Sequence, residues 1–327
     1  MLDVSPAMPS TTGTDGHCLL CGERGWTLVS RTDDREYHAR PGEFDIVRCW
    51  KCGHVYLNPL PAPEEVAALY PPTYYTVNPN SPLFHKSKLI RWKMGKDARD
   101  FRARWGERRF TNLIDIGCGD VKRIAAYRDA YADCGAQATA FDLLFSDRAR
   151  ALAKELNVEC REGNIEADVA SLPDNAYDLA FMRQLIEHLR DPRQALLNLR
   201  PKLKPGALLV IDTPNVGGLD FDLFHNSYWA GFHTPRHFHL FNQASLTTLV
   251  QEAGFKVIDR GYLPSIGFWI ISLRVKFGLD CVEEGGWPWR HISLKNIVFS
   301  GGFTVLDTLC IKLGMATSNQ FVVAVKE

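Results

Sequence analysis

The sequence predicts an α/β fold, in which a mostly parallel β-sheet carries helices on both faces and a small metal-binding module precedes it. Three observations predict this class. An apolar run at residues 112–116 breaks into Asp115-x-Gly117-x-Gly119, segments of strand and helix character alternate after it, and two Cys-x-x-Cys-Gly sequences stand near the start of the chain. A strand that enters a glycine turn and then a helix is a common cradle for a nucleotide cofactor.

Composition narrows the class of protein further. The chain has 327 residues, 46% of them hydrophobic, which is enough for two domains or for one large domain with appendages. Its 38 basic residues equal its 38 acidic ones, so it lacks the overall positive charge of a typical nucleic-acid binder. Residues 1–15 lack the basic start and apolar core of a signal peptide, and the apolar windows are shorter than a membrane span. We expect a cytoplasmic protein with reduced cysteines.

The start of the chain is expected to form a separate module. Residues 1–16 are rich in Pro, Ser, Thr and Gly and are expected to be disordered. Residues 17–57 contain two cysteine knuckles, each followed by glycine, and residues 44–48 alternate like a strand leading into the second knuckle. The four predicted ligands are Cys18, Cys21, Cys49 and Cys52. Four thiolates form a closed tetrahedral site for Zn(II), which predicts a zinc-ribbon-like structural module rather than a catalytic metal.

Residues 58–110 are expected to link this module to the main domain. Prolines exclude long helices between residues 57 and 82, apart from a short one near 64–70. The tyrosines in this stretch, Tyr70, Tyr74 and Tyr75, either anchor the linker to the core or contact the cofactor edge. Residues 85–109 interleave basic and apolar side chains and predict an amphipathic helix. Its basic face could meet a phosphate, a nucleic acid, an anionic membrane surface or only solvent.

The main domain is expected to span residues 111–327. Strands are predicted at 112–116, 137–141, up to Cys160, 177–182, 207–212, 256–261 and 320–325, and helices at 121–128, 146–156, 192–203 and 243–253. Repeated strand and helix units of this length indicate a parallel sheet covered on both faces, with the last strand antiparallel. Asp142 ends the second strand of this series, where a carboxylate can accept the two hydroxyls of a ribose.

The motifs together resemble a known family. They are Asp115-Ile116-Gly117-Cys118-Gly119, Asp142, Leu172-Pro173-Asp174, Glu187-His188, Asp191-Pro192, Lys204-Pro205-Gly206 and Pro214-Asn215. In this order and spacing the chain resembles the class I S-adenosylmethionine-dependent methyltransferases, in particular a branch with an N-terminal two-knuckle zinc module. The resemblance implies a Rossmann-like sheet of seven strands, a methyltransferase activity and S-adenosylmethionine as the cofactor.

The same resemblance implies roles for particular residues. Asp115, Gly117, Cys118 and Gly119 would surround the methionine part of the cofactor. Asp142, with Leu143 beside it, would bind the ribose, and Asn164 and Ile165 would border the adenine. Arg183 and Gln184 would line the face on which the methyl group is transferred. One position departs from the family pattern, because Val121 stands where a third glycine is usual, and valine resists a positive φ. This substitution leaves weakened or lost cofactor binding open.

A base is expected among the histidines, because methyl transfer to a hydroxyl or an acidic carbon needs one. The first candidates are Glu187 and His188, which could equally cap the turn after their strand. The second group is the Trp229-x-Gly231-x-His233-x-Pro235-Arg236-His237 loop, which also resembles the zinc-module methyltransferases. We predict His233 or His237 as the base and Arg236 as an anion contact, within a lid at residues 219–242. The alternative is that these side chains only tie the lid to the core.

An apolar insertion at residues 264–318 delays the last strand. It could add core, cap the acceptor pocket, form a homodimer face or touch a membrane beside the basic helix.

Three functions stay open from the sequence. The first is a methyltransferase acting on an O or C atom of a small molecule such as a sugar, sugar nucleotide, quinone-like ring or lipid-linked acceptor. The second is an RNA methyltransferase that grips nucleic acid with the zinc module, which the balanced charge and the Arg183-Gln184-Leu185-Ile186 strand end disfavour. The third is a non-catalytic binding protein on this scaffold.

Overall fold

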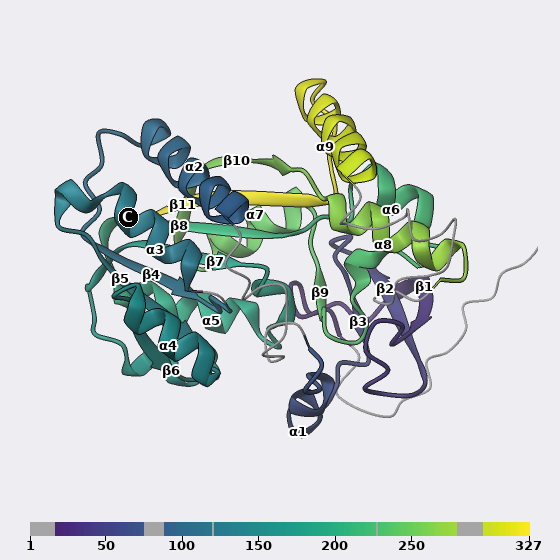
Figure 1. The fold of residues 1–327 in the computed structure, drawn as a ribbon. Coiled ribbons are helices and arrows are strands. Elements are labelled where there is room, and N and C mark those ends of the chain that lie inside the picture. Colours follow the sequence, from purple (N-terminus) through teal and green to yellow (C-terminus); the bar gives the residue numbers. More distant parts are fainter. Residues whose placement is uncertain (1–16, 75–87, 120, 227, 280–296) are drawn as a thin grey trace, which may run out of the picture.

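A computed structural model describes most of the chain. The described residues are 17–74, 88–119, 121–226, 228–279 and 297–327, and the side chains of 88–90 and 297 are not described. Figure 1 shows one large sheet with its helices, beside a smaller group of strands and helices.

The large sheet has seven strands in the order β10-β11-β8-β7-β4-β5-β6. The pairs among β8, β7, β4, β5 and β6 are parallel, whereas β11 pairs antiparallel with both β10 and β8. The strands are β4 (Asn112–Ile116), β5 (Gln137–Asp142), β6 (Glu159–Glu162), β7 (Tyr177–Arg183), β8 (Leu203–Pro214), β10 (Phe255–Leu263) and β11 (Asn319–Lys326). This confirms the predicted Rossmann-like sheet with an antiparallel last strand.

Helices cover both faces of this sheet. On one face, Leu196 and Leu199 of α5 (Pro192–Leu199) and Leu249 of α7 (Gln243–Glu252) are buried against apolar strand residues. On the other face lie α2 (Lys88–Arg104), α3 (Lys122–Ala130) and α4 (Asp147–Glu155). Strand residues alternate between the two cores, as Leu113 and Ile114 do, because successive side chains of a strand point to opposite faces.

A second sheet of four strands stands beside the carboxyl ends of the parallel strands (Figure 1). Its order is β1-β2-β3-β9, all antiparallel. Three strands come from the N-terminal module, namely β1 (Trp26–Asp33), β2 (Glu43–Cys49) and β3 (Val55–Asn58). The fourth, β9 (His239–Leu240), comes from the segment predicted as a lid. The predicted module is therefore completed by a strand from the main domain.

The predicted lid is packed as protein interior. Residues 228–241 are buried throughout, and large side chains among them share a core with the second sheet and with α6 (Leu219–Phe224) and α8 (Ile266–Lys276). Trp229 donates a hydrogen bond from Nε1 to Asp220 at 2.9 Å. A mobile flap over an open site would leave its aromatic side chains partly exposed to water. Here the large apolar area of these side chains is buried, so the segment differs from such a flap.

Element boundaries differ from the predicted ones in places that have local causes. The helix predicted at 192–203 ends at Leu199 and continues as a short 3-10 turn (Arg200–Lys202). Pro201 explains the change, since proline lacks the amide hydrogen that an α-helix requires. The strand predicted to end at Cys160 runs to Glu162, where Arg161 and Glu162 pair with Phe141 and Asp142 of β5.

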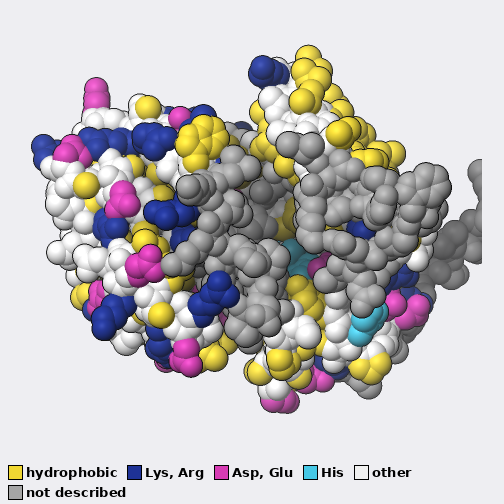
Figure 2. All heavy atoms as spheres, in the orientation of Figure 1, with side chains coloured by type: hydrophobic (Ala, Val, Ile, Leu, Met, Phe, Trp, Pro, Cys, Tyr) yellow, Lys and Arg dark blue, Asp and Glu magenta, His cyan; other side chains and the backbone are white. Residues whose placement is uncertain are grey.

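The insertion forms two helices in the described part of the chain. Helix α8 packs with the second sheet in one core, whereas α9 (Ile297–Lys312) packs against α8 and β10 and projects from the molecule (Figure 1). Figure 2 shows hydrophobic side chains gathered over α9. Val298, Val305 and Leu309 of α9 are exposed, as is Leu313 directly after the helix. Residues 280–296 of the predicted insertion lie outside the described residues. Dimer formation and membrane contact therefore stay predictions, and none of the described helices is long and apolar enough to cross a membrane.

Candidate active site

The glycine turn after β4 has the conformation that its sequence predicts. Gly117 has φ +68° and Gly119 has φ +50°, values that favour glycine. The Gly117 amide donates to the carbonyl of Phe141 at 2.8 Å, which ties the turn to the neighbouring strand β5. A Cβ at Gly117 would lie 2.8 Å from two carbons of Leu185, so the turn also touches the segment that follows β7.

Val121 occupies an ordinary helical conformation. Its φ is −64° and its ψ is −13°, and it is the residue before the first turn of α3. Its side chain is fully buried among the apolar residues on the α3 face of the sheet. The position thus requires no positive φ, and the backbone gives no reason why valine should disturb the turn.

The predicted ribose residue closes the same turn. Asp142 accepts the Gly119 amide on Oδ2 at 2.8 Å and the Leu143 amide on Oδ1 at 2.7 Å. Each carboxylate oxygen has a second lone pair that can accept a hydroxyl. Burial raises the pKa of Asp142, and the two amides oppose that rise. Leu143 beside it is 68% exposed, so an apolar surface stands next to the carboxylate.

The predicted adenine residues lie after the adjacent strand. Asn164 accepts the Glu166 amide at 2.8 Å and donates its own amide to Asp168 at 2.9 Å. Ile165 is buried in the core beneath this turn. Because β4, β5 and β6 are neighbouring parallel strands, their carboxyl ends bring the glycine turn, Asp142 and Asn164 to one edge of the sheet.

Arg183 of β7 lies between two carboxylates, the buried Asp115 of β4 and the partly buried Asp212 of β8. Its guanidinium lies 3.8 Å from Asp115 Oδ2 and 3.7 Å from Asp212 Oδ2, and it also stacks over the ring of Phe181 at 3.9 Å. Burial raises the pKa of Asp115 to about 6, although the charge of Arg183 lowers it. The sequence analysis did not single out Asp212, whose pairing follows only from the adjacency of β7 and β8.

Gln184 has the left-handed conformation, with φ +47°. Its side-chain amide donates to Asp212 at 3.0 Å and to Asn319 at 3.1 Å. A non-glycine residue in this region is strained, and such strain concentrates at functional sites. The strained residue turns the chain from β7 directly into Leu185 and the Glu187-His188 pair.

Glu187 is a fully buried carboxyl group. Its Oε2 accepts the hydroxyl of Thr213 at 2.8 Å, and its Oε1 has no hydrogen-bond partner in the described part of the chain. His237 Nε2 lies 3.9 Å from Oε1. Burial raises the pKa of Glu187 to about 8, so the carboxyl group holds a proton at neutral pH.

Three imidazoles lie together above this carboxyl group. The ring centroids of His188 and His237 are 4.6 Å apart, those of His233 and His237 are 4.9 Å apart, and those of His188 and His233 are 6.0 Å apart. His188 Nδ1 lies 3.1 Å from the Arg236 carbonyl, and His237 Nδ1 lies 2.8 Å from the Gly231 carbonyl. Burial lowers the pKa of His188 to about 3 and that of His237 well below its usual range. Both rings are therefore neutral.

One ligand atom each from Glu187, His188 and His237 lies within 4.8 Å of the other two. Two imidazole nitrogens and a carboxylate can bind a transition metal.

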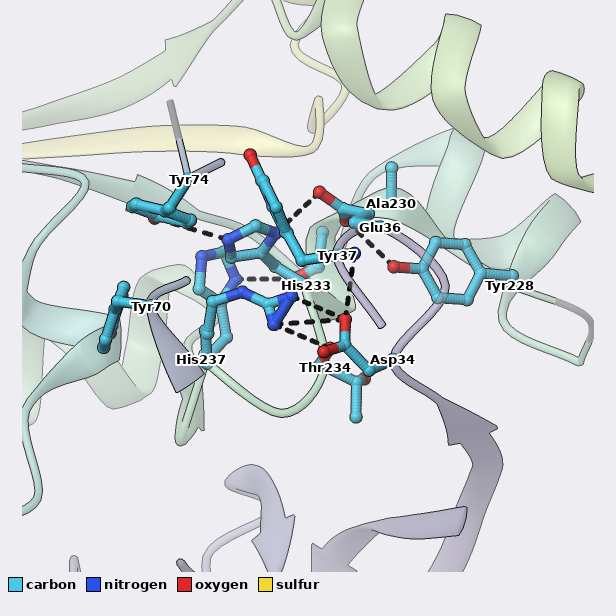
Figure 3. A network of polar contacts seen from close by, with 12 residues as sticks. Asp34, Glu36, Tyr37, Tyr70, Tyr74, Tyr228, Ala230, His233, Thr234 and His237 are labelled. Atoms are coloured by element: carbon cyan, nitrogen blue, oxygen red, sulfur yellow. Dashed lines mark hydrogen bonds and ion pairs between the residues drawn. The ribbon is translucent and has the colours of Figure 1, made fainter. Parts of the chain in front are cut away.

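The N-terminal module contributes acids that the sequence analysis did not identify. Figure 3 shows Asp34, Glu36 and Tyr37, from the loop after β1, among the histidines. Glu36 Oε2 lies 2.8 Å from His233 Nδ1, and Glu36 Oε1 accepts the hydroxyl of Tyr228 at 2.9 Å. No local motif marks these acids, since 197 positions separate Glu36 from His233.

Arg236 is part of a closed ion pair. Its guanidinium donates to Asp34 Oδ1 at 2.5 Å and lies over the ring of Tyr37 at 4.6 Å. The side chains of both Arg236 and Asp34 are inaccessible to solvent, at 0% and 1% exposure. A buried carboxylate of the chain itself thus pairs with the guanidinium that we predict as an anion contact, and the role of Arg236 toward substrate stays a prediction.

Two linker tyrosines contact histidines of the cluster, and Figure 3 marks the contact between Tyr74 and His233. The Tyr70 hydroxyl lies 3.2 Å from His188 Nδ1, and the Tyr74 hydroxyl lies 3.4 Å from His233 Nε2. The sequence left open whether they anchor the linker or contact the site, and the structure brings them into the histidine cluster. Tyr75 lies outside the described residues.

The four predicted zinc ligands converge at the edge of the second sheet. The sulfurs of Cys18 and Cys52 are 3.6 Å apart, and those of Cys21 and Cys49 are 3.5 Å apart. Ligands about 2.3 Å from a tetrahedral zinc ion are separated by nearly these distances, so the four thiolates fit the ion. His54, next to the second knuckle, is buried and lies 3.0 Å from His239 of β9, measured from Nε2 to Nδ1.

Comparison with known proteins identifies the family. A family model described as a methyltransferase domain matches residues 84–260, which is more than half of the 327 residues. The chain therefore belongs to this methyltransferase domain family.

Individual relatives agree with this assignment. A Mycolicibacterium smegmatis protein named "Probable S-adenosylmethionine-dependent methyltransferase" is 30% identical over 148 residues, which are 45% of this chain and 53% of that protein. A malonyl-acyl-carrier-protein O-methyltransferase of Pseudescherichia vulneris is 31% identical over 119 residues, 36% of this chain and 44% of that enzyme. The match thus spans about half the length of these curated relatives. A crystal structure of a methyltransferase from Archaeoglobus fulgidus, 17% identical, aligns with 73% of this chain and 98% of its own at a TM-score of 0.43.

The protonated state of Glu187 predicts a pH dependence of stability. Between its ordinary pKa of 4.5 and its raised pKa of about 8, the folded protein keeps a proton that the unfolded chain releases. The unfolded state binds fewer protons, so the contribution of Glu187 to the free energy of unfolding falls as the pH rises through this window. Glu187→Gln cannot ionise, and its stability relative to the parent should rise by up to about 1.4 kcal/mol per pH unit.

Urea denaturation of both proteins between pH 5 and pH 8 measures this difference. Glu64→Gln, which removes an exposed carboxylate on α1 (Pro63–Val66), is the control. A stability difference that stays constant over the whole range would contradict the proposed protonation of Glu187.

Proposed function

We propose that this protein transfers the methyl group of S-adenosylmethionine to an oxygen or an acidic carbon of a small molecule, with a histidine as the base. The observation that carries the proposal is the histidine cluster next to the cofactor turn. Leu185 touches Gly117, and Glu187 and His188 follow within three residues. A base placed beside the sulfonium methyl group can deprotonate the acceptor while the site aligns the two for in-line transfer.

The cofactor is proposed to lie along the carboxyl edge of β4, β5 and β6. The turn of Gly117, Cys118 and Gly119, with Asp115 in the strand before it, would hold the methionine part. Asp142 would accept the ribose hydroxyls, with Leu143 beside them. Asn164 and Ile165 would border the adenine. Arg183 and Gln184 would line the face on which the methyl group is transferred. Arg183 is held there by Asp115 and Asp212, and Gln184 is held by Asp212 and Asn319.

The base must have a lone pair and must also be able to keep the proton that it accepts. Burial keeps His188 and His237 unprotonated and disfavours their imidazolium forms. His233 is therefore the stronger candidate, because Glu36 lies 2.8 Å from its Nδ1 and can stabilise its imidazolium. When the acceptor loses its proton to an imidazole, its lone pair attacks the methyl carbon, and the carbon–sulfur bond breaks to release the neutral thioether. We infer a small acceptor of the sugar, sugar nucleotide, quinone-like or lipid-linked type. The named O-methyltransferase relative supports an oxygen acceptor.

We also infer that the four cysteines hold a structural zinc ion. All four positions of a tetrahedral ion would be filled, which leaves none for substrate. The ion would stabilise the second sheet and, through it, the loop that carries Asp34 and Glu36.

Binding of the cofactor tests the first part of the proposal. Gly117→Ala should lower the affinity for S-adenosylmethionine and S-adenosylhomocysteine at least tenfold, because its Cβ would meet Leu185 at 2.8 Å in a left-handed turn. Gly135→Ala is the matched control, since Gly135 has φ +72° and nothing within 4 Å of an added Cβ. Calorimetry measures both, and equal affinities in the two variants would contradict the placement of the cofactor.

Transfer of label tests the second part. Methyl-labelled S-adenosylmethionine, incubated with the protein and with separate small-molecule and RNA fractions of a cell extract, should label only the small-molecule fraction. His233→Ala should slow this transfer by about 10²-fold or more, whereas His225→Ala, directly after α6 and outside the cluster, should not. Label confined to RNA would instead support the nucleic-acid methyltransferase.

Metal removal tests the zinc proposal. The purified protein should contain one zinc ion per chain by elemental analysis, and Cys52→Ser should lose it together with several degrees of melting temperature. Cys134→Ser, outside the knuckles, should keep the ion. A zinc-free parent protein of unchanged melting temperature would contradict the proposal.

A further inference from the structure

The loop after β1 inserts between the histidines and the aromatic interior of the molecule. Asp34, Glu36 and Tyr37 come from this loop, and each contacts the 228–241 segment. The Asp34–Arg236 pair is closed to solvent, and the Asp34 carboxylate accepts hydrogen bonds from Arg236 and from the amides of its own loop. Glu36 differs, because it bonds directly to an imidazole (Figure 3).

The Glu36 contact determines which nitrogen of His233 carries the proton. Glu36 Oε2 lies 2.8 Å from Nδ1, and a carboxylate only accepts hydrogen bonds. Nδ1 must therefore carry a hydrogen, and in the neutral ring Nε2 then presents a lone pair. The Tyr74 hydroxyl lies 3.4 Å from Nε2, where it can donate to that lone pair.

Glu36 is held as a carboxylate. Burial by itself would raise its pKa, but the interaction with His233 and the hydrogen bond from the Tyr228 hydroxyl lower it below its usual value. Its side chain is only 10% exposed, so solvent does little to screen the interaction with His233.

The backbone of His233 is fixed in an uncommon conformation. Its φ is +40° and its ψ is +41°, the left-handed region, at the end of the short 3-10 turn Ala230–Phe232. Its carbonyl accepts the amide of Arg236 at 2.8 Å, and its own amide donates to Ala230 at 3.2 Å. Strain of this kind persists where the surroundings determine the position of a side chain.

We propose that Glu36 is a positioning residue for the methyl-transfer reaction, which holds His233 with Nε2 as the catalytic base. This rests on the proposed function. The acceptor would take the place beside Nε2 that the Tyr74 hydroxyl now marks. Its O–H or C–H proton moves to Nε2, its lone pair forms the new bond to the methyl carbon, and the carbon–sulfur electrons stay on sulfur. Glu36 balances the charge of the resulting imidazolium, which later returns its proton to solvent.

The proposal assigns a catalytic contribution to the N-terminal module. Glu36 belongs to the loop between β1 and β2, strands of the sheet that contains Cys49. If the module only stabilised the fold, the Asp34–Arg236 pair and the apolar contacts of the second sheet would be enough. The contact of the Glu36 carboxylate with His233 Nδ1 would then have no purpose.

The tautomer of His233 provides a test that needs no acceptor. Nitrogen NMR of histidine-labelled protein should show the hydrogen on Nδ1 of His233 in the parent protein. In Glu36→Gln the side-chain amide can either donate or accept, so His233 should show a mixture of both tautomers. Tyr228→Phe keeps the carboxylate and should keep the parent tautomer. A Glu36→Gln spectrum identical to that of the parent would overturn the proposal.

Kinetics provide the second test. With an acceptor found in the labelling experiment, Glu36→Gln should lower kcat about 10²-fold while the affinity for S-adenosylmethionine stays within twofold. Glu36→Asp, which restores a carboxylate, should recover part of kcat, and Glu64→Gln should match the parent. A folded Glu36→Gln protein with kcat within twofold of the parent would also overturn the proposal. If the parent transfers no methyl group, the proposed function fails, and the tautomer still decides whether Glu36 positions His233.

Discussion

The arrangement of the molecule depends on acids of the N-terminal module that are buried against cationic or imidazole partners of the main domain. Asp34 and Arg236 are both closed to solvent, and removing either partner would leave a charge uncompensated in the interior, at a cost of several kcal/mol. The two-residue strand β9 adds backbone hydrogen bonds to β3 at the same place. Through these contacts the N-terminal module lines one side of the candidate site and is joined to the main domain.

The site itself has two halves with different origins. The parallel sheet supplies one half, because the carboxyl ends of β4, β5 and β7 place the glycine turn, Asp142 and the Glu187-His188 pair along one edge. The module and the linker supply the other half through Glu36, Tyr70 and Tyr74. The segment with the histidines lies between the halves, so its side chains are buried on both sides.

Protonation in this cluster follows from local surroundings rather than residue type. Burial raises the pKa of Glu187 to about 8 and keeps it protonated. Glu36 is also largely enclosed, but the imidazole of His233 and the hydroxyl of Tyr228 lower its pKa. His188 and His237 donate to backbone carbonyls and stay neutral because burial disfavours the imidazolium. The cluster therefore contains both a proton donor and proton acceptors at neutral pH.

The sequence by itself determined the features that depend on local spacing. The glycine turn, the alternation of strands and helices and the paired cysteine knuckles each follow from residues within one or two elements, and the structure has all three. Val121 shows the limit of such reasoning. The absence of a glycine disturbs a turn only where the backbone needs a positive φ, and Val121 has a negative φ. Only the tertiary structure decided that Arg236 pairs with Asp34 and that Glu36 meets His233. Pairs 202 and 197 positions apart have no periodicity to reveal them, because they arise where two parts of the fold that are distant in sequence bury polar groups against each other.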